Sequence, residues 1–306
     1  MGSLFRITLF APDKTNADAA AVAAFERVEQ LDRAMSDYDP QSELMQLCRR
    51  PVGGPTRVSD DLFSVLQTAQ KLSAQTDGAF DVTVGPMIQL WRTARKTKVL
   101  PGENEIGEAR KAVGWKKLKL DSQNRTATLL APNMKLDLGG IAKGFAADEA
   151  MRILKKRGIN RAMVAASGDI ALGEPPPGER GWKIGIAAMD STTNQTSRVL
   201  FLRNCGVSTS GDTEQFVEIG GVRYSHIVNP KTGLGLTERV QATVIAPDAT
   251  RSDSFATTVC VLGAQRGRRF IESQRRTDVF ILAKNYGTNV TYESQNFHRR
   301  SVTEPR

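Results

Sequence analysis

The sequence predicts an α+β protein in which helices pack on mostly antiparallel sheets. Apolar residues recur at helical spacing mainly in the first half of the chain, whereas alternating or wholly apolar short runs dominate the second half. The two kinds of segment follow one another irregularly and do not repeat as a strand–helix–strand unit. At 306 residues the chain exceeds a typical single domain, so we expect one large unit or two intimately packed lobes.

The first half begins with a strand and a long amphipathic helix. Residues 4–11 alternate, and residues 16–35 carry an apolar stripe that ends at Met35. Ser59 is a suitable N-cap for a second helix. The further elements expected in this half are a helix over 103–113, a hairpin over 127–130 and 134–138, and a helix over 141–156 closed by Gly158.

The second half is dominated by strands. The proline-rich stretch 175–178 lies between strands, so we expect a surface loop rather than a linker between domains. We therefore treat residues 1–306 as a single domain, with a polar tail over about residues 293–306. The expected elements are strands over 161–166, 182–187, 198–202, 222–228, 241–246, 279–283 and 289–292, and a helix over 250–262.

Composition limits the class of protein. No run of 18 apolar residues is present, so nothing in the sequence is expected to span a membrane. The net charge of +9 would suit nucleic acid, but only 6% of residues are aromatic and the basic residues fall in short scattered clusters. We therefore expect an anionic small molecule or partner, and no nucleic acid. The three cysteines lack a CxxC spacing, which argues against a disulfide framework and structural zinc.

Residues Lys135–Gly144, with the sequence KLDLGGIAKG, form the most informative segment. A short alternating run ends in Asp137 and two glycines, and a helix-like segment then begins with Lys143 in its first turn. Glycines at such a turn let the backbone approach a phosphate closely, and helix N–H groups with a lysine supply positive potential. The spacing fits neither the P-loop nor the dinucleotide-binding pattern. A glycine-rich turn with a surface lysine is therefore an equally good reading of this segment alone.

Two further positions carry candidate chemistry. Asp253 and Thr257 lie four residues apart in an expected helix, so they share one face, and a carboxylate with a hydroxyl suits an all-oxygen Mg²⁺ site. The alternative is that Asp253 caps the helix and Thr257 packs inward. His226, one of two histidines, is either a hydrogen-bonded core residue or a functional group that orients phosphate or moves a proton.

Five motifs taken together resemble the FAD:protein FMN transferase (ApbE) family, over about residues 1–290. Each motif alone is weak, but their order and separations are specific. They are AFDVTVGP (79–86), the glycine turn (135–144), TSGD (209–212), YSHIVNPKTG (224–233) and SDSFAT (252–257).

The resemblance implies an activity and a site. Members transfer FMN from FAD to a Thr or Ser hydroxyl of an acceptor flavoprotein, with Mg²⁺ and release of AMP, in a flavin cleft between two lobes. It implies Asp253, Thr257 and the main-chain carbonyl of Gly140 as metal ligands, and Asp253 with His226 as catalytic groups. The positions that match flavin contacts are Met1, Tyr38, Ala79, Phe80, Asp81, Asp137, Lys143 and Ile227.

Departures from the family pattern concern substrate positioning. Asn229 and Lys231 stand where the family has Asp and Arg, so a carboxylate and a bidentate fork are lost. An FAD pyrophosphatase that gives FMN and AMP, or an FAD-binding protein without turnover, are the rival functions. Family members are usually exported, as periplasmic proteins or membrane-anchored lipoproteins. No signal segment precedes Phe5, so we leave the compartment open.

Overall fold

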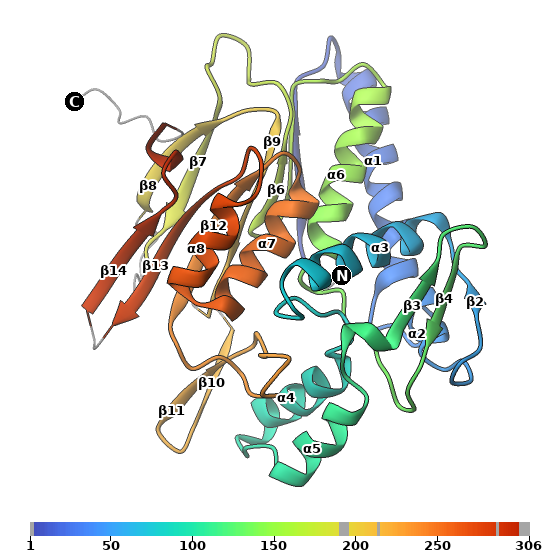
Figure 1. Ribbon diagram of the computed structural model, residues 1–306. Coiled ribbons are helices and arrows are strands. Elements are labelled where there is room, and N and C mark those ends of the chain that lie inside the picture. Colours follow the sequence, from blue (N-terminus) through green and yellow to red (C-terminus); the bar gives the residue numbers. More distant parts are fainter. Residues whose placement is uncertain (1–2, 190–195, 213–214, 286–287, 300–306) are drawn as a thin grey trace. The chain divides into compact units, whose positions relative to one another are not determined.

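A computed structural model describes residues 3–189, 196–212, 215–285 and 288–299, and its mixture of helices and antiparallel sheets confirms the α+β class (Figure 1). The described residues fall into two compact units. The helical unit contains residues 30–142 and 215–237. The sheet unit contains residues 3–29, 143–189, 196–212, 238–285 and 288–299.

The sheet unit is built on seven strands, and each neighbouring pair is antiparallel. Strand β12 (Val240–Ala246) is buried along its whole length and pairs with β9 (Cys205–Ser210) on one side and β13 (Asp278–Asn285) on the other. A separate pair, β7 (Trp182–Ala187) and β8 (Thr196–Leu202), belongs to the same unit. In spatial order the seven strands are β1 (Phe5–Leu9), β5 (Ala162–Ala166), β6 (Asp169–Leu172), β9 (Cys205–Ser210), β12 (Val240–Ala246), β13 (Asp278–Asn285) and β14 (Thr288–Glu293).

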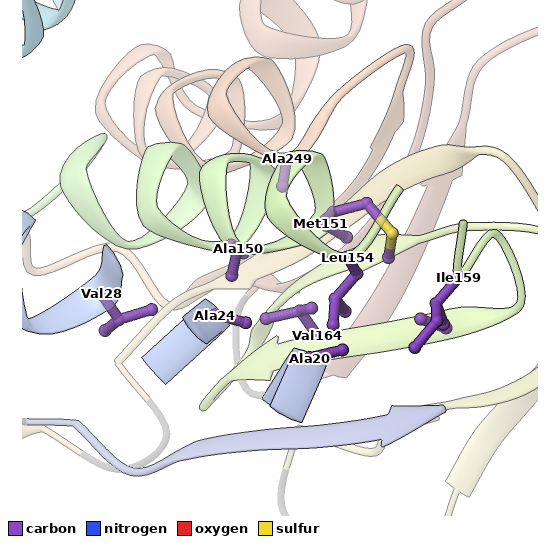
Figure 2. Packing of buried hydrophobic residues seen from close by; sticks show 12 residues of the cluster. Ala20, Ala24, Val28, Ala150, Met151, Leu154, Ile159, Val164 and Ala249 are labelled. Carbon is purple, nitrogen blue, oxygen red and sulfur yellow. The ribbon is translucent and has the colours of Figure 1, made fainter. Parts of the chain in front are cut away.

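Small side chains let two helices of the sheet unit approach each other and the sheet. Helix α1 (Lys14–Met35), of which residues 14–29 belong to this unit, contributes Ala20 and Ala24, and α6 (Ala142–Lys156) contributes Ala150 beside the larger Leu154, all fully or almost fully buried. Figure 2 shows these side chains converging with Val164 of β5. Burial of this apolar surface is the main stabilising term for the unit.

The end of α6 follows the expectation from sequence. Gly158 has φ +80°, and the N–H of Ile159 donates to the carbonyl of Leu154 at 3.0 Å. This pattern is the left-handed C-cap that glycine allows. Two more helices follow in the sheet unit, α7 (Ala249–Leu262) and α8 (Ala264–Glu272). Cys260 of α7 is 4% exposed and belongs to the core.

The segment expected to form a polar tail begins with packed structure. β14 pairs with β13 as far as Glu293, and the short helix η2 (Phe297–Arg299) follows. Phe297 is fully buried and stacks on Phe280 with ring centroids 5.4 Å apart. His298 is exposed, and residues 300–306 lie outside the described part of the chain.

The helical unit has its core around Trp91 of α4 (Gly85–Thr97). The Trp91 side chain is 2% exposed, and its indole N–H donates to the carbonyl of Gly233 at 2.8 Å. Ser59 caps α3 by accepting the N–H of Leu62, as its sequence position predicts. The other elements are α2 (Glu43–Leu47), α3 (Asp60–Gln75), α5 (Glu103–Lys111), η1 (Trp115–Lys117), the sheet β2 (Thr56–Arg57), β4 (Thr126–Leu129) and β3 (Leu118–Asp121), and the hairpin β10 (Phe216–Ile219) and β11 (Val222–Ser225).

One expected pairing is wrong, and several elements were not expected. Strand β4 pairs with β2 and β3 rather than with residues 134–138. Those residues instead lie along 82–84, since Lys135 forms a parallel bridge with Val84 and the N–H of Asp137 donates to the carbonyl of Val82. The elements that sequence reasoning missed include α2, α4, α8, β6, β9 and β10.

Membrane-spanning capacity can be judged from the helices. Within the described ranges, no helix combines the length and the apolar character that crossing a bilayer requires.

Candidate functional site

The contact between α6 and α7 places the first candidate residue. The backbone N–H of Gly144, in the first turn of α6, donates to Oδ2 of Asp253 on α7 at 3.0 Å. A Cβ atom on Gly144 would lie 2.2 Å from the carbonyl oxygen of Ala249 and 2.8 Å from Cβ of Asp253. Only glycine therefore allows the two helices to approach this closely.

A second carboxylate secures the same contact from the other direction. Asp148, one turn after Gly144 on α6, accepts the N–H groups of Ala249 and Thr250 at 2.9 and 2.8 Å. It also accepts the hydroxyl of Thr250 at 2.6 Å. The first N–H groups of a helix have no partner within the helix, and they favour a negative charge. Each helix thus supplies a carboxylate that caps the start of the other.

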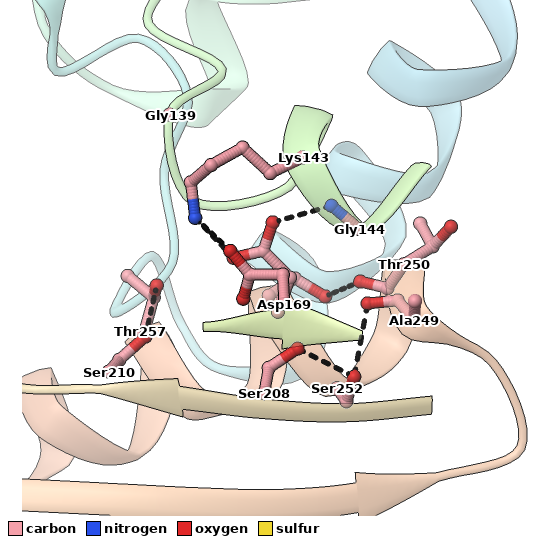
Figure 3. Close-up of polar contacts among 12 residues, drawn as sticks. Gly139, Lys143, Gly144, Asp169, Ser208, Ser210, Ala249, Thr250, Ser252 and Thr257 are labelled. Atoms are coloured by element: carbon pink, nitrogen blue, oxygen red, sulfur yellow. Dashed lines mark hydrogen bonds and ion pairs between the residues drawn. The ribbon is translucent and has the colours of Figure 1, made fainter. Parts of the chain in front are cut away.

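Lys143 lies between two buried carboxylates of the sheet unit. Its ammonium group pairs with Asp169, the first residue of β6, and lies 3.9 Å from Oδ1 of Asp253 (Figure 3). The side chains of Asp169 and Asp253 are 2% and 1% exposed. One cation is therefore shared by two anions in a site of low dielectric constant, where the attraction is strong.

The protonation of this cluster follows from its burial and charges. Burial, and then the neighbouring charge of Asp169, raise the pKa of Asp253 to about 7. Burial opposes the charge of Lys143, but the carboxylates of Asp253 and Asp169 overcome it and raise the pKa of the lysine above its usual value. Lys143 thus stays protonated, whereas the negative charge on Asp253 carries a desolvation cost.

Thr257 completes the oxygen-rich face of α7. It is half-buried one turn after Asp253, and its hydroxyl lies 3.3 Å from Oγ of Ser210 on β9 (Figure 3). Ser252 of α7 likewise exchanges a hydrogen bond of 2.7 Å with Ser208 of β9. These contacts set the rotation of α7 against the sheet. Asp253 and Thr257 therefore share a face, as their spacing predicts.

The donor set can be tested against a metal ion. Among the described residues, no group of three or more His, Cys, Asp or Glu side chains could hold a metal. An ion at Asp253 would therefore need hydroxyl, carbonyl and water oxygens as its other ligands, which is the ligand set that Mg²⁺ prefers. Asp253 and Thr257 fit that requirement. Gly140, expected to add a carbonyl, belongs to the helical unit.

Within the helical unit, Tyr38 and Asp137 are brought together by Arg92 of α4. The guanidinium carbon of Arg92 lies 4.2 Å from the centroid of the Tyr38 ring. Its Nη2 donates to Oδ2 of Asp37 at 2.5 Å and to Oδ2 of Asp137 at 3.2 Å. Burial, and then the charge of Asp37, raise the pKa of Asp137 to about 6. Oδ1 of Asp137 also accepts the N–H of Gly139, which shapes the glycine turn.

The segment 79–85 is buried in the same unit. Ala79 and Phe80 are 7% and 4% exposed, so little of either residue is open to a ligand. Oδ1 of Asp81 accepts the N–H and the hydroxyl of Thr83 at 2.8 and 2.7 Å. Burial raises the pKa of Asp81 above its usual value. Asp81 therefore stabilises the turn before α4.

His226 and Ile227 lie next to β11 in the helical unit. The backbone N–H of His226 donates to the carbonyl of Gln215 at 3.1 Å, and Nδ1 lies 3.0 Å from the same oxygen. That distance is a hydrogen bond from a protonated Nδ1, which fixes the orientation of the ring. Ile227 is 8% exposed. Met1, the remaining expected flavin contact, lies outside the described residues.

Three residues of these clusters were missed from sequence. Asp169 follows a turn in which Ser167 has φ +56°, and it begins β6, a strand that was itself not expected. Asp148 is a carboxylate among the buried alanines of α6, which is a detectable signal because unpaired charge is rare on such a face. Arg92 carries no local signal, since its partners lie 45 and 55 residues away.

Comparisons with known proteins agree with this description. The family model of the ApbE family matches residues 1–281. A protein of Klebsiella pneumoniae named FAD:protein FMN transferase is 28% identical, over 99% of this chain and 88% of the relative. One of Vibrio cholerae with the same name is 30% identical, over 88% and 81%.

The comparison with solved structures also finds flavin transferases named ApbE. The flavin transferase ApbE from Vibrio cholerae superposes with a TM-score of 0.88 at 29% identity, covering 98% of this chain and 96% of that one. The apo form of the flavinyl transferase ApbE from Pseudomonas stutzeri has a TM-score of 0.87 at 27% identity, covering 100% and 95%.

The fold and the site together define an α+β protein with a buried carboxylate cluster at the start of two mutually capped helices. The family model and the curated relative match most of the length of this chain. The chain therefore belongs to the ApbE family.

Proposed function

We propose that this protein is an FAD:protein FMN transferase. A Thr or Ser hydroxyl of an acceptor flavoprotein attacks the phosphorus of the FMN half of FAD. The new oxygen–phosphorus bond forms as the bond to the AMP phosphate oxygen breaks, AMP leaves, and the hydroxyl proton is released. The family match supports this reaction, and the buried Asp253 with its oxygen-rich helix face is the observation that carries it.

Mg²⁺ is the metal we assign to the site. Asp253 and Thr257 would hold it with their side-chain oxygens, and Gly140 with its carbonyl. When bound, the ion would neutralise the charge that develops on the diphosphate as the bond to AMP breaks. The chain's own contribution is to hold the Asp253 carboxylate in place through Gly144 and to balance Asp169 with Lys143.

The flavin contacts remain as inferred from the motifs. Tyr38, the main chain of Ala79 and Phe80, Asp137 and Ile227 would bind the flavin, with Met1 and Asp81 as further contacts. Lys143 would attract the diphosphate as a point charge. His226 would orient the phosphate or accept the proton of the attacking hydroxyl, a role that its fixed ring suits.

Transfer is tested by following both products. The protein is incubated with FAD, Mg²⁺ and a flavoprotein that carries a candidate Thr, and AMP release and the acceptor mass are measured. We expect slow hydrolysis of FAD alone, faster AMP release with the acceptor, and an acceptor mass increased by one FMN phosphoester. The Thr→Ala acceptor should gain no mass.

Other outcomes separate the rival functions. Rapid AMP release without labelling of any acceptor would indicate an FAD pyrophosphatase. FAD binding without AMP release under any condition would indicate a non-catalytic flavin-binding protein. The replacements at Asn229 and Lys231 make acceptor positioning the step most exposed to change.

A further inference from the structure

One exposed aromatic side chain in the helical unit is held in place by a neighbouring arginine. Tyr38 is 67% exposed, yet the guanidinium of Arg92 lies over its ring at 4.2 Å from the centroid. Exposed side chains ordinarily sample several rotamers, and ordering one costs conformational entropy. A ring that is already ordered in the free protein binds a planar ligand without that cost.

Arg92 itself is anchored by two carboxylates. Its Nη2 bonds Asp37, the residue before Tyr38, and Asp137, the residue that begins the glycine turn. The side chains of Arg92, Asp37 and Asp137 are 23%, 18% and 15% exposed. Nε of Arg92 is buried with no hydrogen-bond partner among the described residues. The arginine is therefore held by two carboxylates that share its Nη2 and by stacking on the Tyr38 ring, and the stacking is the part that requires a planar guanidinium.

We propose that Arg92 is a positioning residue for the isoalloxazine ring of the flavin, acting through Tyr38. This inference rests on the proposed function. The guanidinium covers one face of the Tyr38 ring, so the opposite face is the one that stacks on the flavin. The same arginine ties that ring to Asp137, so the stacking platform and the start of the glycine turn keep a constant separation.

If Arg92 acts through Tyr38, its removal should weaken the binding only of ligands that contain the isoalloxazine ring. Arg92→Ala frees the Tyr38 ring, and affinity for FAD and FMN should fall about tenfold, as expected for one lost stacking interaction. Affinity for ADP, which lacks the isoalloxazine, should stay within about twofold of the unmodified protein. Flavin fluorescence quenching measures the first pair, and calorimetry measures ADP. A defect of folding alone would lower all three affinities together.

A double-mutant cycle tests whether Arg92 acts through Tyr38. If it does, Arg92→Ala should change FMN affinity by less than about twofold when Tyr38→Ala is already present. Lys96→Ala is the matched control, because Lys96 is an exposed cation one turn later on the same helix. It removes the same charge and should leave FMN affinity unchanged.

Results that would overturn this inference differ from the result that would refute the proposed function. Unchanged FMN affinity in a folded Arg92→Ala protein, equal losses for FMN and ADP, or additive effects in the cycle would overturn the inference. If Arg92→Ala does not fold, Arg92→Lys carries the test, since it keeps the charge and loses the planar group that stacks on the Tyr38 ring, and we expect an intermediate loss of FMN affinity. Absence of FAD and FMN binding by the unmodified protein would instead refute the proposed function.

Discussion

Asp148 and Asp253 cap each other's helix. Asp253 on α7 accepts the N–H of Gly144 on α6, and Asp148 on α6 accepts the N–H groups of Ala249 and Thr250 on α7. At each helix start, a side chain of the opposite helix thus accepts backbone N–H groups, and at α7 the N-cap Asp248 accepts a further one, from Arg251. As a result, the carboxylate proposed to bind the metal cannot move without disturbing the packing of α6 against α7.

Gly144→Ala should separate the two helices. The new Cβ would collide with the carbonyl of Ala249, which is backbone and cannot rotate away. We expect a loss of about 2–3 kcal/mol in the free energy of unfolding, measured by urea denaturation. Gly107→Ala is the control: Gly107 lies within α5 with open space around it, so this change should be neutral or slightly stabilising. Equal stability of the two variants would contradict the close contact.

Asp253→Asn should lower the activity of the protein without lowering its stability. The amide oxygen can still accept the N–H of Gly144, and the cost of burying a charge disappears. We therefore expect an unchanged or higher melting temperature, together with a fall on the order of 100-fold or more in Mg²⁺-dependent AMP release. Asp18→Asn, at an exposed position on α1, serves as the control. Full activity in folded Asp253→Asn protein would exclude this residue as a metal ligand.

Lys143→Met should leave two buried carboxylates without their shared cation. We expect a loss of about 3 kcal/mol in the free energy of unfolding at neutral pH, because removal of one partner of a buried pair exposes the full cost of the other. Adding Asp169→Asn should restore part of that stability, since one of the two charges is then gone. The exposed Lys14–Asp18 pair is the comparison, and Lys14→Met should cost less than about 0.5 kcal/mol. Strictly additive losses in the double variant would argue against the pairing.

The stability of the α6–α7 contact should depend on pH through Asp148. Burial raises the pKa of Asp148 to about 6, so the native state binds this proton more tightly than the unfolded chain, whose value is near 3.8. The native state therefore loses relative stability as the pH rises from about 4 to about 6. Relative to Asp148→Asn, we expect the unmodified protein to lose roughly 2 kcal/mol across that window. Denaturation curves at pH 4, 5, 6 and 7 measure the difference, and a constant difference would refute the raised pKa.

Local signals in the sequence were sufficient for elements whose determinants lie within a few residues. The N-cap Ser59, the glycine that ends α6 and the alternating strands of the sheet unit depend on neighbouring residues, so their periodicity and caps predicted them. Helix α4 was missed although Pro86 in its first turn is a start signal, because the residues before it were interpreted only as part of a motif. The prediction of a hairpin over 127–138 was wrong because each of its two segments pairs with another part of the chain.

The sequence by itself determined the α+β class, the order of the motifs that resemble the ApbE family, and the shared face of Asp253 and Thr257. The last follows from helix geometry alone. Only the tertiary structure decided what those residues contact. Gly144 meets Asp253 across 109 positions of the chain, and Arg92 meets Asp137 across 45. Such partners are selected when helices and strands pack, since close packing of the whole core chooses among many pairings that local sequence leaves equivalent.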